Sequence, residues 1–220
     1  MNPQYIDSLL PANPEPTLQF LSFLIVLAFI PLIVLTTTPF LRIIIVLSLI
    51  RQAIGVPQSP PNLVLTGLAL ILTTFIMGPS FDEINQKAIT PLARKEITVG
   101  QAMSVAYIPL RARMLNQVDQ KDIRFFYELS ERPAPTSAGD IGFSELIAAH
   151  ILGELRIAFS LGFLVFIPFL VVDLIVANIL LALGMMFLSP TIISLPFKLM
   201  VFVAVDGWAL LIKGLVESFR

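Results

Sequence analysis

The feature that most constrains the fold of this chain is a pair of long apolar stretches that flank one charged segment. Of the 14 basic and 15 acidic side chains, 19 lie between Asp82 and Arg156. No charge occurs from Thr17 to Leu41, and the 56 residues from Ile157 to Ile212 contain only three. A helix needs about 20 apolar residues to cross a bilayer. With 56% hydrophobic and 13% charged residues, against about 25% charged in soluble domains, the composition is that of a membrane protein.

Helix-end signals divide the chain into four segments. Residues 1–17 lack the basic and apolar regions of a signal peptide and are predicted to be an extended tail. Residues 18–79 are predicted to form a first apolar helical hairpin, kinked at prolines, whose second helix ends at Gly78-Pro79. Residues 80–142 are predicted to be a polar helical domain and linker, and residues 143–220 a second long helical hairpin. The predicted fold class is therefore all-α, with kinked helical hairpins of the membrane-protein type on either side of a small polar helical domain.

A bend interrupts the second apolar half at "LALGMMFLSP", residues 181–190. Gly184 is predicted to end one helix, Ser189 to cap the next and Pro190 to occupy its first turn. Three large apolar residues, Met185, Met186 and Phe187, then fall on non-helical backbone. Inside hydrocarbon, such backbone is tolerated only when it is buried in protein or lines a cavity. The bend is predicted to face an assembly or a pore, unless it is a turn at the membrane surface, which is the more common case.

Charged residues within the apolar stretches are costly unless they are paired or face a wet cavity. Lys198 has no acid nearby in the sequence, and we hypothesise that it pairs with Glu154 of the same or a neighbouring copy. The alternative is that these charges are interfacial residues or pairs already satisfied within the chain. The remaining charges of this kind are Arg42, Arg51, Asp173 and Asp206.

Several classes of function lack support in the sequence. A net charge of −1 provides no basic surplus for nucleic acid. His150 with Glu145 and Glu154 is a weak ligand set, so a histidine satisfied within its helix is the preferred interpretation over a metal site. No serine has a plausible base beside it, and the chain has no cysteine and no nucleotide-binding loop. We therefore predict no cofactor, no metal and no enzymatic activity.

Three stretches together resemble one protein family. They are "LRIIIVLSLIRQAIGVPQSPPNLVLTGLALILTTFIMGP" (residues 41–79), "FLVFIPFLVVDLIVANILLALGMMFLSP" (163–190) and "SLPFKLMVFVAVDGWALL" (194–211). They are similar to the FliP family of flagellar biosynthetic proteins, whereas residues 82–142 match more loosely. The family's methionine-rich sealing loop falls on residues 184–190, where Phe187 stands in place of a third methionine. The family's charge pair falls on Glu154 and Lys198.

The resemblance implies a subunit of the export gate of the flagellar type III secretion system, in the basal body at the bacterial inner membrane. It implies that several copies, typically five, assemble with FliQ and FliR family proteins into a closed helical funnel, largely lifted out of the bilayer plane. It further implies FlhB and FlhA family partners and unfolded flagellar proteins as cargo. The alternatives are a small-ion or solute channel, which should show rings of polar filter residues, and a membrane scaffold without a gate.

Overall fold

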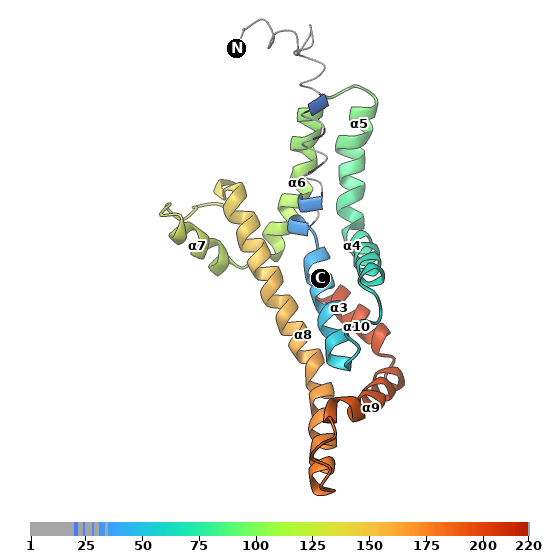
Figure 1. The fold of residues 1–220 in the computed structure, drawn as a ribbon. Helices are drawn as coiled ribbons and strands as arrows, with labels where there is room; N and C mark the ends of the chain where they lie inside the picture. The colour runs from blue at the N-terminus through green and yellow to red at the C-terminus, as the bar shows by residue number, and fades with distance from the viewer. Residues whose placement is uncertain (1–19, 22–23, 25–27, 29–30, 34, 220) are drawn as a thin grey trace, which may run out of the picture. The chain divides into compact units, whose positions relative to one another are not determined.

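The structure is a computed structural model that describes residues 20–21, 24, 28, 31–33 and 35–219. The chain divides into two units, Met1–Leu35 and Thr36–Arg220. The predicted tail, residues 1–17, lies outside the described residues. The second unit contains every helix discussed below (Figure 1).

The second unit is built from helices joined by short connections, and the described part of the chain contains no strand. The predicted all-α class is therefore confirmed. In chain order the elements are α3 (Phe40–Ile54), α4 (Asn62–Ile84), the π-helix η1 (Asn85–Ile89), α5 (Thr90–Ala93), α6 (Val99–Gln117), α7 (Gln120–Leu129), the 3-10 helix η2 (Ala138–Asp140), α8 (Phe143–Ala182), α9 (Pro190–Ala204) and α10 (Gly207–Glu217).

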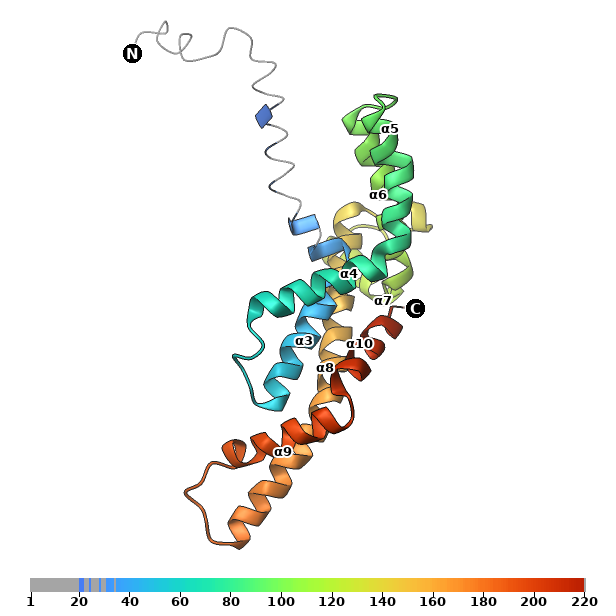
Figure 2. The ribbon, with the colours of Figure 1, turned by 90° about the vertical axis from the view of Figure 1, so that its right-hand side faces the viewer.

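The 40-residue helix α8 is the element along which α3, α6, α7 and α9 pack (Figures 1 and 2). α3 lies beside it because Ile43, Leu47 and Ile50 recur at helical spacing and are fully buried in the larger apolar core. Gly162 of α8 allows this close approach, since a Cβ atom there would lie 2.2 Å from a methyl carbon of Leu49. The α3 and α8 contact thus holds together the two apolar halves of the sequence.

The second apolar helix does not end at Gly78-Pro79, as predicted, but continues to Ile84 and then into η1 and α5. Proline normally disfavours a helical residue before it, because its ring crowds the preceding Cβ atom. Gly78 has no Cβ, which relieves that clash, and the continuing helix gains contacts with α6. The proline still removes one helix hydrogen bond, and Figure 2 shows the axis of α4 turning before it reaches α5.

The polar segment packs on the N-terminal part of α8. Thr98 and Gln101 form a capping box at the start of α6, and α7 begins directly after Asp119. A smaller core unites α6 and α7 with α8; its buried members are Met114, Ile123, Tyr127, Ile141, Leu146 and Ala149. This core contains residues from both sides of the predicted boundary at residue 143.

Among the described residues, two helical stretches are long and apolar enough to cross a membrane, Asn62–Ala93 and Phe143–Ala182. α9 and α10 would also qualify if taken together as one broken span, bent by 65°. At this bend Asp206 adopts a φ of 51°, a left-handed conformation that is uncommon for residues other than glycine. The described helices therefore agree with the membrane class that the composition predicts.

Candidate functional site

The bend between α8 and α9 is a short turn closed by backbone hydrogen bonds. Gly184 has a φ of 73°, the left-handed conformation that commonly follows the end of a helix, and Met185 N donates to Leu180 O at 2.9 Å. Pro190 is the first residue of α9 and Ser189 precedes it as the N-cap residue. The Ser189 hydroxyl makes no capping bond, however, and instead lies 2.8 Å from Oγ1 of Thr191. The turn is thus ordered by backbone geometry rather than by a side-chain cap.

The side chains of this turn form an exposed apolar tip. Met186 is 75% exposed, Phe187 is fully exposed, and Met185 and Leu188 are about half exposed. No charged residue occurs in the turn. We call Met185, Met186, Phe187 and Leu188 the apolar tip. Four consecutive large apolar side chains in the open are unfavourable in water, so the tip is suited to contacts with other apolar surfaces.

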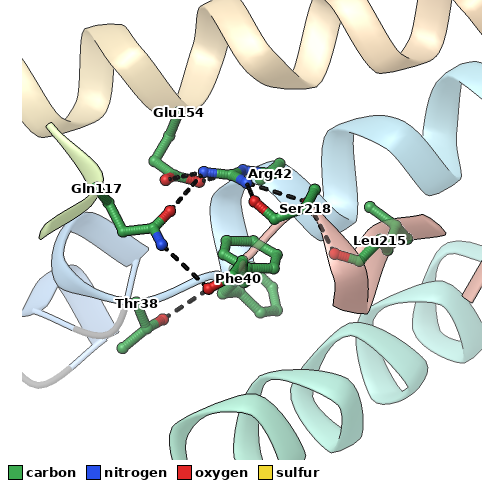
Figure 3. Close-up of polar contacts among 8 residues, drawn as sticks. Thr38, Phe40, Arg42, Gln117, Glu154, Leu215 and Ser218 are labelled. Atoms are coloured by element: carbon green, nitrogen blue, oxygen red, sulfur yellow. Dashed lines mark hydrogen bonds and ion pairs between the residues drawn. The ribbon is translucent and has the colours of Figure 1, made fainter. Parts of the chain in front are cut away.

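A charge site lies near the N-terminal end of α3, and Figure 3 shows its members converging on Arg42. The Glu154 carboxylate accepts from Nε at 2.8 Å and from Nη2 at 2.5 Å. Nη1 donates to the carbonyl and hydroxyl oxygens of Ser218, and Nη2 also donates to Oε1 of Gln117 at 3.1 Å. Arg42 is completely buried and Glu154 is 2% exposed. Such a pair is tolerated because nearly every donor of the guanidinium has an acceptor.

An aromatic ring completes the environment of this guanidinium. The Phe219 ring centre lies 3.8 Å from the Arg42 carbon Cζ, which is a cation–π contact. Gln117 Nε2 donates to the Phe219 carbonyl at 3.2 Å. The Arg42 site therefore joins α3, α6 and α8 to the segment that follows α10.

A second charge site lies between α8 and α9. Lys198 Nζ donates to Asp173 Oδ2 at 2.6 Å and to the carbonyl of Ala53, at the end of α3, at 3.2 Å. The Ser194 hydroxyl donates to the other Asp173 oxygen at 2.5 Å. This arrangement fixes α9 against α8 and against the C-terminal end of α3.

Glu154 and Lys198, the pair suggested by the sequence, are not brought together within this chain. Glu154 is bound by Arg42, while Lys198 is bound by Asp173. The physical reason is that the fold places Arg42 beside Glu154 and Asp173 beside Lys198. These partners are 112 and 25 residues apart in the sequence, so no local pattern indicates the pairing. Contact between Glu154 and Lys198 of neighbouring copies stays a prediction.

The other two charges singled out in the sequence have different surroundings. Arg51 donates through Nη1 to the Pro60 carbonyl at 3.1 Å and to Asn62 Oδ1 at 2.7 Å, so it ties the end of α3 to the start of α4. The Arg51 Nε atom is buried, and no described residue accepts a hydrogen bond from it. Asp206 is exposed at the bend between α9 and α10.

Sequence reasoning missed several polar residues that complete these sites. Gln117, Ser218 and Phe219 contact Arg42 across separations of 75 residues or more, and no local pattern marks them. The buried Asp122, which binds Arg156 at 2.6 Å, was likewise not singled out.

Two polar groups beside the Arg42 site lack hydrogen-bond partners within the described part of the chain. His150 is buried and its Nε2 atom has no partner among the described residues, unlike the satisfied histidine that the sequence suggested. Nη2 of Arg113, on α6, is also buried without a partner. Burial lowers the pKa of Arg113, the Glu154 carboxylate acts in the opposite direction, and the charge of Arg42 adds to the lowering.

Apolar helices of membrane-spanning length, charges paired in the interior and an apolar turn define a helical membrane-associated protein. A sequence model of the FliP family matches residues 23–215. The chain is 44% identical over 209 residues to the flagellar biosynthetic protein FliP of Bacillus subtilis (strain 168), covering 95% of both chains. It is 47% identical over 206 residues to the protein of the same name from Caulobacter vibrioides, covering 94% of this chain and 77% of the relative. The chain belongs to the FliP family of flagellar biosynthetic proteins.

Proposed function

We propose that this protein is a core subunit of the export gate of the flagellar type III secretion system and that its apolar tip closes the channel. The observation that carries the proposal is the exposure of Met185, Met186 and Phe187 on non-helical backbone between two apolar helices. Within the part of the chain that the structure describes, these side chains are largely exposed. Copies arranged around an axis would bury their tips against one another.

The chemistry of the tip suits a seal that yields and closes again. Methionine is unbranched and polarizable, so Met185 and Met186 can repack around a passing chain without one fixed fit. Phe187 contributes a larger apolar surface but has fewer rotatable bonds. Burying apolar surface contributes about 25 cal/mol for each Å² removed from water, so a ring of such tips favours the closed state without any charged lock.

The two charge sites would hold the α8 and α9 hairpin that carries the tip. Lys198 anchors α9 to Asp173 and to α3, and Arg42 anchors α8 through Glu154. Movement of the tip relative to this base is then confined to the helix ends around residues 181–190. The charge sites are therefore proposed to be fixed supports, and the turn the moving part.

Membership of the FliP family supports the remaining parts of the proposal. The subunit would act at the bacterial inner membrane in copies of itself, five in number, together with FliQ and FliR family proteins. FlhB and FlhA family proteins would complete the apparatus, and unfolded flagellar proteins would be the cargo. Residues 80–142 would form the polar part of each subunit.

Leakage through the assembled complex tests the role of the tip. Replacing Met185, Met186 and Phe187 together by alanine should make membranes that contain the complex permeable to small solutes, while its native mass stays unchanged. Met200 and Val203, which are exposed on α9 outside the turn, provide the matched control when both are changed to alanine. A tip variant that assembles fully and leaks no more than this control would refute the gate.

A charge exchange tests contact between copies. If Glu154 and Lys198 pair across a subunit boundary, the double variant Glu154→Lys with Lys198→Glu should assemble better than either single variant. If the partners within the chain are the only ones that matter, the double variant should assemble no better, because Arg42 and Asp173 would each face a like charge. The measurement is the native mass of the complex extracted in detergent.

A further inference from the structure

Helix α7 of the polar segment exposes two charged and two large apolar side chains on one side. Arg124 and Glu128 are exposed one helical turn apart. Phe125 and Leu129, which lie beside them, are also exposed, while Ile123 on the other side of the helix is buried in the smaller core. We call Arg124, Phe125, Glu128 and Leu129 the α7 face. It combines opposite charges with apolar surface, as protein contact surfaces commonly do.

A cavity of about 840 Å³ borders the α7 face. Arg124 and Glu128 belong to its lining, and α6 and the linker contribute apolar residues, among them Leu115 and Ile141. A concave surface of apolar residues with a few polar groups is suited to receive part of another molecule. The α7 face is therefore shaped for a convex partner, such as the side of a helix.

The end of α4 and the π-helix η1 carry a comparable set of exposed side chains. Asp82 and Gln86 are exposed four residues apart. Phe81 and Ile89, on the same stretch of helix, are large apolar residues that are also exposed. We call Phe81, Asp82, Gln86 and Ile89 the α4 face. Like the α7 face, it belongs to the polar part of the chain, where large apolar side chains in water are unfavourable.

The two faces are complementary in charge and in spacing. Asp82 and Gln86 have the same four-residue separation as Arg124 and Glu128. With the two helices side by side, the Asp82 carboxylate can accept from the Arg124 guanidinium. The amide of Gln86 can then donate to the Glu128 carboxylate. The apolar members of both faces would leave water in the same contact.

The two faces lie on different sides of the second unit. In Figure 1, α7 lies to the left of α8, whereas α4 and α5 lie to the right; Figure 2, seen from the right, shows α4 and α5 in front. Contact between two different faces of identical chains is heterologous, and it generates a ring when the rotation between copies closes. The arrangement thus suits successive copies placed around an axis.

We propose that the α4 face of one copy docks on the α7 face of the next copy. Asp82 pairs with Arg124 across the contact, and Phe81 packs against Phe125 and Leu129 beside the cavity. The inference rests on the proposed function, because it requires several copies around one channel. It adds a contact in the polar segment, separate from the apolar tip and from the charge sites.

Disulfide cross-linking of the full-length protein in membranes tests this contact. The chain has no cysteine, so introduced pairs report without background, and a disulfide forms only when the two Cα atoms lie about 4–7 Å apart. Phe81→Cys with Leu129→Cys should give a ladder of covalent multimers under mild oxidation. Either change alone should give none, because the two faces differ. Leu129→Cys with Val203→Cys is the matched control and should give no ladder, since Val203 is exposed on α9 outside both faces.

Charge reversal in the Phe81→Cys, Leu129→Cys protein tests the ion pair. Asp82→Arg and Arg124→Asp should each lower the cross-linked yield several-fold, because like charges then meet across the contact, and the two together should restore it. Lys213→Glu, at an exposed position on α10, is the control and should leave the yield unchanged.

The native mass of the same samples distinguishes the possible failures. A multimer without a ladder from Phe81→Cys with Leu129→Cys would overturn this contact and leave the proposed assembly of copies intact. A covalent dimer from Leu129→Cys alone would overturn it as well, because α7 would then meet α7. Charge reversals that behave like Lys213→Glu would also refute the pairing. A monomeric native mass would refute both this contact and the proposed function.

Discussion

Removing the Glu154 carboxylate is the most informative perturbation of the Arg42 site. In Glu154→Leu, Nε of Arg42 loses its acceptor and Nη2 keeps only Gln117. The guanidinium stays fully buried, with Ser218 and the Phe219 ring as its other contacts. Breaking a buried ion pair from one side costs about 3–5 kcal/mol, because the remaining charge has no counter-charge.

The expected loss is large enough to measure as a melting temperature. For a chain of this size, 1 kcal/mol corresponds to a shift of about 2–4 °C, so Glu154→Leu should lower Tm by roughly 6–20 °C. Helix content followed by circular dichroism during heating in detergent micelles is a suitable assay. Glu217→Gln is the control, since its pair with Lys213 is exposed and 3.9 Å long, and its loss should cost less than about 1 kcal/mol.

The double variant Arg42→Met with Glu154→Leu distinguishes the effect of breaking the ion pair from the effect of losing side-chain packing. It removes both charges of the pair, although the Ser218 carbonyl loses its donor at a cost of about 1–3 kcal/mol. The double variant should therefore be at least as stable as Glu154→Leu alone. Two results would refute the assignment of Arg42 as the partner of Glu154. One is that the losses of stability in Arg42→Met and Glu154→Leu add up in the double variant. The other is that Glu154→Leu has the same Tm as the Glu217→Gln control.

Two further predictions concern the hairpin of α8, α9 and α10. Asp173→Leu should destabilise the protein by about 1–3 kcal/mol in denaturant titrations, less than Glu154→Leu, because the Asp173 side chain is 31% exposed and Lys198 retains a backbone carbonyl acceptor. Asp173→Leu that costs as much as Glu154→Leu would contradict this ranking. Gly207→Ala should lower Tm, because its Cβ atom would lie 2.2 Å from the buried Phe202 ring and overpacking costs about 1–3 kcal/mol. Gly214→Ala on the same helix, with no atom within 4 Å of the new Cβ, should raise Tm slightly through its higher helix propensity; equal shifts in the two variants would exclude the ring contact as the cause.

Several elements could be predicted from the sequence because local interactions decide them. The turn between α8 and α9 follows from Gly184 and Pro190, whose backbone preferences end one helix and begin the next. The capping box of Thr98 and Gln101 joins residues three positions apart. The division into two apolar halves depends only on where charges occur along the chain. In each case the relevant partners lie within a few residues of one another.

Other local signals were overruled by packing. Gly78-Pro79 is a common helix end, yet α4 continues because Gly78 has no Cβ to clash with the proline ring and α6 packs against the helix beyond it. Ser189 precedes α9 as a cap residue should, but its hydroxyl contacts Thr191 instead of the backbone. A local preference for ending or capping a helix is worth about 1 kcal/mol, and several tertiary contacts together outweigh it.

The sequence by itself therefore determined which segments are apolar and which are polar, the helical class and the position of the apolar tip. Only the tertiary structure decided which charges meet. Arg42 and Glu154 are 112 residues apart, and Lys198 meets Asp173 and Ala53 only because three helices converge there. A buried charge requires some partner, and the sequence makes that requirement visible. The identity of the partner depends on helix crossings that no spacing along the chain encodes.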